Sequence, residues 1–195
     1  MKQFLCQFEL PYVQALKLHL DDPYRLHQWI WDALPEDRDA ERDFLFRSDV
    51  RARTMRILLL SDRKPSIDHI DQWQVTEISD TFLKHPAYRF QVRANPTFRR
   101  GSDKRRLAIF DEEKLRDWFA RKIKNIGAEI CGLELGAPQT IRFRKENKSV
   151  TLVSVDATGL LRVTDPESFQ KGFYDGIGSA KGFGFGLLML QPVNF

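Results

Sequence analysis

The sequence predicts an α+β protein in which two β/α units follow a shared plan. Strand-like segments of alternating polarity are interspersed with amphipathic helical segments in both halves of the chain. The same helix-opening pair, an aspartate followed by a proline, occurs at Asp22-Pro23 and at Asp165-Pro166. At 195 residues, of which 42% are apolar, the chain can bury the core of one large domain or of two small ones.

The first unit is expected over residues 1–96. A helix is predicted from Asp22 to about Ala33, and a weaker helical segment at residues 66–75. The strands are predicted at residues 4–10, 43–47, 54–60 and 88–94. Taken in sequence, these elements read β-α-β-β-α-β, which is the order of a ferredoxin-like unit.

The second unit is expected over residues 107–195, after a basic connector at residues 97–106. A helix from Asp111 to Ile126 ends at Gly127, a favourable helix stop. Strands are predicted near residues 128–135, 140–144, 150–155 and 160–163, and the segment from Arg142 to Lys148 is predicted to form a basic hairpin tip. A helix opened by Asp165-Pro166 and a glycine-rich loop then lead into a last apolar strand.

Composition excludes several classes of protein. No apolar run approaches the ~20 residues that a membrane-spanning helix needs, and the N-terminus lacks the features of a signal peptide. Cys6 and Cys131 both lie in apolar, strand-like surroundings, so we expect buried free thiols in a reducing cytoplasm, with no disulfide and no metal site. The net charge of +4 is modest, but the basic residues are clustered, which suits a polyanionic partner.

The first helix carries the candidate chemistry. Its core face is predicted to consist of Leu26, Trp29, Ile30 and Ala33, which leaves Tyr24 and His27 as neighbours pointing away from the core. Histidine can take and return a proton near neutral pH, and the tyrosine phenol can donate or accept one. Such a pair suits RNA cleavage by the RNA's own 2′-hydroxyl, which needs no metal and no cofactor. On spacing alone, an ordinary surface histidine beside a packing tyrosine is the favoured alternative.

Two basic clusters are candidate RNA contacts, although an exposed basic hairpin is often merely solvated. The first surrounds the connector and the second lies in the hairpin, and Lys181 in the glycine-rich loop could hold a further phosphate. The predicted RNA-binding residues are therefore Arg93, Arg99, Arg100, Lys104, Arg105, Arg106, Arg142, Arg144, Lys145, Lys148 and Lys181.

The glycine-rich loop holds five of the chain's eleven glycines: Gly176, Gly178, Gly182, Gly184 and Gly186. A phosphate-binding P-loop is excluded, because these glycines follow a helix and precede a strand, and no Lys-Ser/Thr pair accompanies them. Such a density of glycine indicates a loop shaped around a ligand or another element. The spacing G-x-G-x-x-K-x-x-G-x-G before an apolar strand resembles the C-terminal signature of the RAMP superfamily of CRISPR proteins.

Three further segments resemble motifs of the CasE family, the repeat-RNA endoribonucleases of type I-E CRISPR systems. They are Asp22 to Trp31, Arg42 to Arg47, and Phe90 to Pro96 leading into the basic connector. Together with the glycine-rich loop they cover most of the chain in the family's order. Ser179 stands where the family often has proline, which is expected to loosen the loop.

The resemblance implies two tandem ferredoxin-like (RAMP/RRM-like) domains and a metal-independent endoribonuclease. Such an enzyme cleaves precursor CRISPR RNA at the base of the repeat stem-loop, leaves 5′-hydroxyl and 2′,3′-cyclic phosphate ends, and stays bound to the product as a Cascade subunit. His27 matches the family's catalytic histidine and Tyr24 its assisting tyrosine. The alternatives are a RAMP subunit that binds the RNA without cutting it and, more distantly, a ferredoxin-like regulator that binds a small molecule.

Overall fold

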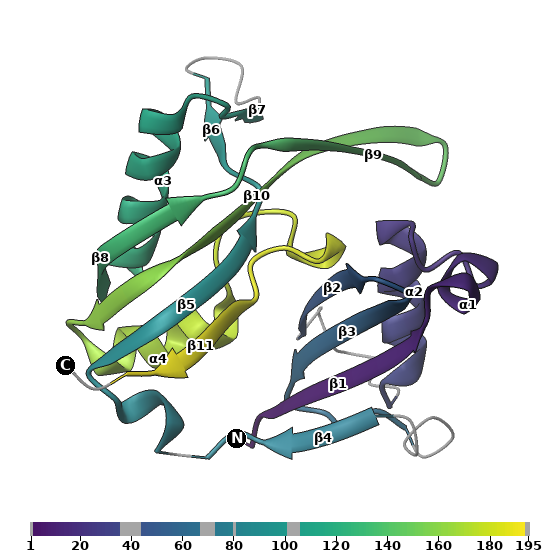
Figure 1. Cartoon of the computed structure of the whole chain (residues 1–195), viewed down its shortest axis with the longest axis horizontal. Coiled ribbons are helices and arrows are strands. Elements are labelled where there is room, and N and C mark those ends of the chain that lie inside the picture. Colours follow the sequence, from purple (N-terminus) through teal and green to yellow (C-terminus); the bar gives the residue numbers. More distant parts are fainter. Residues whose placement is uncertain (1, 36–43, 67–72, 80, 101–105, 194–195) are drawn as a thin grey trace.

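A computed structural model describes residues 2–35, 44–66, 73–79, 81–100 and 106–193. Two antiparallel sheets lie side by side, one built mainly from the first third of the chain and the other from the remainder (Figure 1). The buried apolar residues form two hydrophobic clusters. One lies within the first sheet and its helices, and the other, centred on the second sheet, also contains Leu45, Leu58 and Leu60 of the first sheet, so the two sheets pack against each other there.

The first sheet follows the order β2-β3-β1-β4 with every pair antiparallel. Its strands are β1 (Phe4–Pro11), β2 (Leu45–Arg51), β3 (Thr54–Ser61) and β4 (Trp73–Glu77). The helices α1 (Tyr12–Lys17) and α2 (Pro23–Ala33) connect β1 to β2. Alternate residues of β1 are buried against α2, as the period of a strand requires. Burial raises the pKa of the Cys6 thiol in this core to about 11.

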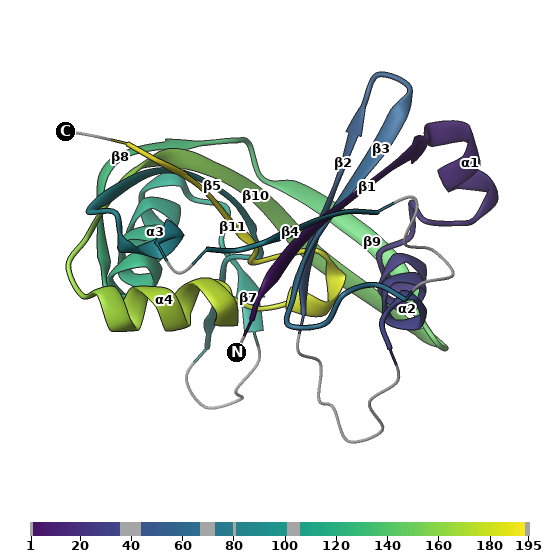
Figure 2. The same ribbon diagram turned by 90° about the horizontal axis from the view of Figure 1, so that it is seen from below.

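The second sheet repeats the same order as β11-β5-β10-β8, with β9 paired to β10. It contains β5 (Ala87–Ala94), β8 (Ala128–Leu135), β9 (Gln139–Lys145), β10 (Lys148–Val163) and β11 (Leu188–Pro192). The helices α3 (Glu112–Asn125) and α4 (Pro166–Asp175) cover one face of it (Figure 2). In each sheet the strand that comes first in the sequence, β1 or β5, lies between the strands that come third and fourth among its main four, β3 and β4 or β10 and β11. This is the strand order of a ferredoxin-like domain, so the predicted tandem ferredoxin-like fold is confirmed.

The expected end of the first domain at residue 96 is wrong. The strand β5 pairs with β10 and β11 of the second sheet, whereas β4 completes the first sheet. The segment 66–75 was expected to be helical, but its last residues begin β4, where Trp73 pairs with Phe8 and packs on its ring; residues 67–72 lie outside the described part. The domain boundary therefore lies between β4 and β5, in the segment that includes the 3-10 helix η2 (Phe82–Lys84).

The basic connector consequently belongs to the second domain. Its described parts form a short antiparallel ribbon of β6 (Thr97–Arg99) and β7 (Arg106–Ala108), which stands beside α3 (Figure 1). The segments at 150–155 and 160–163, expected as separate strands, belong to the single long strand β10. Cys131 is exposed rather than buried, because it lies on β8 at the edge of the sheet; both cysteines are free.

Charged side chains at the junction link the two sheets. The Arg47 side chain, 4% exposed, pairs with Asp49 on its own strand at 3.0 Å and with Asp156 of β10 at 3.1 Å. Arg93 of β5 pairs with both carboxylates at 3.1 Å and donates to the Ser48 carbonyl at 2.8 Å. Arg56 adds a third guanidinium group, 3.3 Å from Asp49. These five charged residues form the junction cluster.

Candidate active site and RNA-contact surfaces

The helix α2 begins where the sequence predicts. Asp22 caps it, because its Oδ1 accepts hydrogen bonds from the backbone N–H groups of Tyr24 at 2.8 Å and Arg25 at 3.0 Å, and Pro23 occupies the first turn. Of the predicted core face, Leu26, Ile30 and Ala33 are buried, whereas Trp29 is only partly buried. Tyr24 and His27 are partly buried and do not belong to the buried face of the helix.

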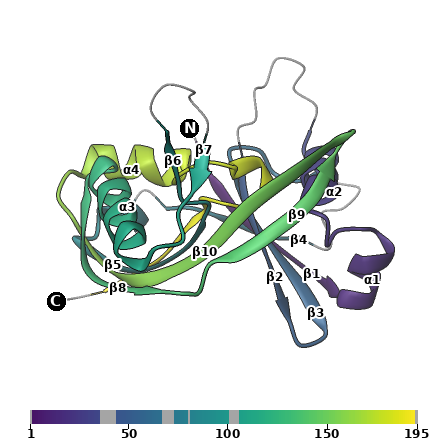
Figure 3. The same cartoon turned by 90° about the horizontal axis from the view of Figure 1, so that it is seen from above.

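Tyr24 and His27 face a pocket of about 820 Å³ that both domains line. The second domain contributes Lys145, from the end of β9, and Gly182 and Phe183 from the 3-10 helix η3 (Lys181–Phe183). The hairpin of β9 and β10 reaches across to α2 (Figure 3). Lys145 and Glu146 of this hairpin line the pocket. The site thus joins residues that lie more than 100 positions apart in the sequence.

The His27 ring is held by aromatic side chains around β2. It stacks on Phe44, with ring centroids 5.5 Å apart and an interplanar angle of 25°, and on Phe46 at 6.3 Å. Trp31, one turn further along α2, lies 6.1 Å from it. A half-buried imidazole in such a stack loses much of its rotational freedom, which is what a positioned proton-transfer group needs.

Lys145 brings a positive charge to Tyr24. Its Nζ lies 5.9 Å from the centroid of the Tyr24 ring. The sequence predicts Lys145 only as an RNA-binding residue, because nothing in the spacing indicates that the hairpin tip folds back over α2. The structure therefore places a cation beside Tyr24 that the spacing of the sequence does not predict there.

The glycine-rich loop packs against the first domain. At Gly184, where φ is +84°, an added Cβ would lie 3.3 Å from Cε2 of Phe46; at Gly176, where φ is +73°, it would lie 2.6 Å from the side chain of Leu45. The glycines thus allow a close approach to β2, the second of the two roles expected for them. Ser179 was expected to loosen the loop, but its hydroxyl attaches the loop to Asn95. The hydroxyl accepts a hydrogen bond from Asn95 Nδ2 at 3.2 Å and donates one to the Asn95 carbonyl at 3.3 Å.

The predicted RNA-binding residues do not form one surface. Arg142, Arg144, Lys145 and Lys148 lie on the exposed hairpin, and Arg99, Arg100 and Arg106 lie on or beside the β6–β7 ribbon. Arg93 is a member of the junction cluster, and Lys181 donates to the Asp175 carbonyl at the end of α4. Lys104 and Arg105 lie outside the described residues.

Sequence reasoning missed the residues that position the site. Phe44, Phe46 and Asn95 lie within segments that resemble family motifs, but the sequence assigns them no role, and only their contacts reveal what they position. Within the described ranges, no group of three or more His, Cys, Asp or Glu residues is arranged to hold a metal ion. The same part of the chain contains no helix that is long and apolar enough to cross a membrane.

Comparison with known proteins finds relatives along nearly the whole chain. A family model described as CRISPR associated protein matches residues 4–192. The Cascade subunit CasE of Escherichia coli is 30% identical over 187 residues, covering 88% of this chain and 93% of the relative. The CRISPR-associated endoribonuclease Cse3 of Thermus thermophilus is 25% identical over 203 residues, covering 93% and 96%.

Solved structures share the whole fold. A structure of CRISPR endoribonuclease Cse3 bound to 19 nt RNA has a TM-score of 0.82 at 21% identity and covers 98% of this chain and 100% of its own. The crystal structure of Cas6e from Escherichia coli has a TM-score of 0.72 at 24% identity, covering 98% and 100%. The match along nearly the entire chain confirms the family resemblance, and the chain belongs to the family of CRISPR-associated proteins.

Proposed function

We propose that this protein is an endoribonuclease that cleaves precursor CRISPR RNA at the base of the repeat stem-loop and keeps the product as a Cascade subunit in the cytoplasm. The observation that carries the proposal is the convergence of Tyr24, His27 and Lys145 on one pocket between the two domains. Relatives across the whole chain are named as a Cascade subunit and as an endoribonuclease, which supports the same activity.

The proposed reaction is an internal transesterification. The 2′-hydroxyl of the nucleotide before the cut loses its proton and attacks the adjacent phosphorus, while the bond to the 5′ oxygen of the next nucleotide breaks and that oxygen takes up a proton. One product ends in a 2′,3′-cyclic phosphate and the other begins with a 5′-hydroxyl. Tyr24 and His27 share the two proton transfers. Lys145 stabilises the negative charge that builds up on the phosphoryl oxygens.

Tyr24, His27 and Lys145 supply the proton-transfer groups and the cation for this reaction, so we propose that cleavage needs no metal ion and no cofactor. The exposed arginines of the hairpin, Arg142 and Arg144, hold the phosphates of the repeat stem, which proteins recognise mainly through its shape and backbone. Binding and chemistry are thus assigned to neighbouring residues of one hairpin.

A single-turnover assay with labelled repeat RNA in excess EDTA tests the proposal. The wild type is expected to cut the RNA, whereas His27→Ala should slow cleavage by about 10²- to 10⁴-fold while RNA affinity stays unchanged. His19→Asn is the matched control, because His19 is exposed, lies outside the pocket and has a φ of 56°, which asparagine tolerates.

Three results would contradict the proposal. If His27→Ala cuts at the wild-type rate, His27 does not transfer a proton. If activity disappears in EDTA and returns with magnesium, the reaction depends on a metal ion. Retention of uncut RNA by the wild type would favour the alternative, a subunit that binds CRISPR RNA without cutting it.

A further inference from the structure

Two adjoining pockets, of about 290 and 470 Å³, lie along the glycine-rich loop and separate from the catalytic pocket. The smaller one lies between the β6–β7 ribbon, α3 and the loop, and the larger one between α3, α4 and the loop. Lys122 of α3 and Gly178 of the loop line both of them. We call the two together the ribbon groove.

The ribbon groove has an excess of positive charge. Arg99 and Arg106 line it from the ribbon, Lys122 from α3 and Lys171 from α4, whereas Asp175 is the one acidic residue among its lining residues in the described ranges. Arg99 and Arg106 are also direct cross-strand partners in the ribbon. Like charges directly opposite each other destabilise a strand pair, and a bound anion would relieve this repulsion. The charge of the groove therefore favours a negatively charged ligand.

The ribbon groove lies close to the catalytic pocket along the chain. Ser179 lines the groove and Gly182 lines the catalytic pocket, and three residues span at most about 11 Å even when fully extended. An RNA strand that leaves the catalytic pocket would therefore reach the groove within a few nucleotides. In Figure 1 the ribbon stands beside α3 while η3 is turned toward α2, so the loop connects the two places.

The size and the lining of the groove favour a single strand over a duplex. A-form duplexes are held across broad, shallow surfaces, whereas unpaired nucleotides enter small pockets and stack on aromatic rings. Phe98 lines the smaller pocket and is 46% exposed, so its ring is available for a base. Building on the proposed function, we propose that the ribbon groove binds the unpaired RNA that flanks the repeat stem next to the scissile phosphate.

The test compares the affinities of three RNAs that carry a 2′-deoxy nucleotide at the cleavage site to prevent cutting. One is the bare stem-loop, which ends one nucleotide beyond the cleavage site so that the scissile phosphodiester is complete, and the other two carry a longer unpaired flank at the 5′ or the 3′ end. We expect one flank to tighten binding to the wild type and to steepen the dependence of log K on log salt by about 0.7 for each phosphate held. In Arg99→Ala/Arg106→Ala this gain should be lost, while affinity for the bare stem-loop stays unchanged.

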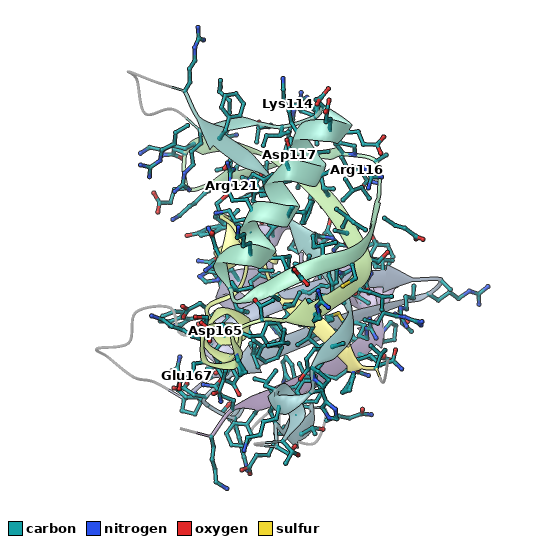
Figure 4. The ribbon with its side chains drawn as sticks, turned by 90° about the vertical axis from the view of Figure 1, so that its left-hand side faces the viewer. Lys114, Arg116, Asp117, Arg121, Asp165 and Glu167 are labelled. Carbon is teal, nitrogen blue, oxygen red and sulfur yellow. The ribbon has the colours of Figure 1, made fainter. Side chains whose placement is uncertain are left out.

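Two further variants guard against an effect on folding. Lys122→Met removes the charge but keeps an unbranched side chain over the Trp118 ring, which Lys122 Nζ approaches to 5.5 Å, and it should also lose the gain. Arg121→Ala is the control, because Arg121 is exposed on the same helix (Figure 4) but lines neither pocket, and it should keep the gain.

The inference is overturned if neither flank tightens binding to the wild type, or if the gain persists in both groove variants. Cleavage of the bare stem-loop RNA with its 2′-hydroxyl intact is measured in parallel. If the wild type cuts this RNA but gains nothing from a flank, the proposed function stands and only the groove assignment fails. If it neither binds nor cuts, both fail together.

Discussion

Replacing Lys145 by alanine should slow cleavage far more than it weakens RNA binding. Lys145 Nζ lies 5.9 Å from the centroid of the Tyr24 ring, so a phosphate bound next to that ring would lie at a similar distance from Nζ. Two unit charges about 6 Å apart attract each other by about 2.8 kcal/mol at an effective dielectric constant of about 20. Each 1.4 kcal/mol or so of lost transition-state stabilisation costs a factor of ten. Lys145→Ala is therefore expected to slow the chemical step about 100-fold.

Single-turnover cleavage with enzyme in excess over RNA measures this step directly, because saturation removes the contribution of binding. Lys145→Arg keeps the charge and should restore most of the rate. Arg142→Ala is the matched control, since Arg142 lies on the same strand, is exposed and does not line the catalytic pocket. Cleavage by Lys145→Ala within about threefold of the wild type would refute the assignment of Lys145 to the chemical step.

Two further predictions concern RNA affinity and the conformation of the glycine-rich loop. Arg142→Ala/Arg144→Ala should weaken RNA binding and flatten the dependence of log K on log salt by about 0.7–0.9 per lost phosphate contact, while the cleavage rate of the bound complex stays intact. Binding titrations at several salt concentrations check this. An unchanged slope would mean that neither arginine contacts a phosphate. Gly184→Ala should lower both stability, by about 1–2 kcal/mol, and the single-turnover rate, because it places a Cβ at a positive φ and 3.3 Å from Phe46. Gly132→Ala, whose Cβ would meet no atom within 4 Å, is its control.

Local patterns predicted the parts of the fold that depend on neighbours in sequence. The Asp22-Pro23 and Asp165-Pro166 pairs both begin helices, because a cap and its backbone donors lie within three residues of each other. The buried face of α2 followed from the period of a helix. The same period predicts that Tyr24 and His27 lie outside that face, and both are only partly buried.

Long-range pairing could not be predicted in the same way. The strand pattern of Ala87–Ala94 is clear in the sequence, but the pattern does not say which sheet the strand joins. The sequence alone places it in the first domain, because the short strand β4 overlaps a segment whose pattern is helix-like. Lys145 likewise reaches Tyr24 only because the β9–β10 hairpin crosses to the other domain, and no local spacing encodes that contact.

The junction cluster links the stability of the fold to the geometry of this divided site. Burial by itself would raise the pKa of Asp49, but the guanidinium groups of Arg47 and Arg93 outweigh it and hold the pKa below the ordinary value of 3.8. Because the folded-state pKa is depressed, the carboxylate stabilises the protein above about pH 4, and this contribution is lost as the pH falls further. The cluster joins the strand that carries Phe46 to the domain that carries Lys145.

Asp49→Asn should therefore destabilise the protein at neutral pH but much less in acid. At pH 7 the substitution removes the carboxylate that pairs with Arg47, Arg56 and Arg93, and only Arg47 and Arg93 also contact Asp156. Breaking so well buried a pair costs about 3 kcal/mol. Urea unfolding at pH 7, 5 and 3 should show the full difference from the wild type at the first two values. The difference should be smaller at pH 3, which is below the ordinary carboxyl pKa of 3.8, because there the unfolded wild-type chain takes up a proton on Asp49. Asp117→Asn, on the exposed side of α3, should show no such trend (Figure 4). A difference that is absent at pH 7, or equally large at pH 3, would mean that the charge of Asp49 does not hold the two domains together.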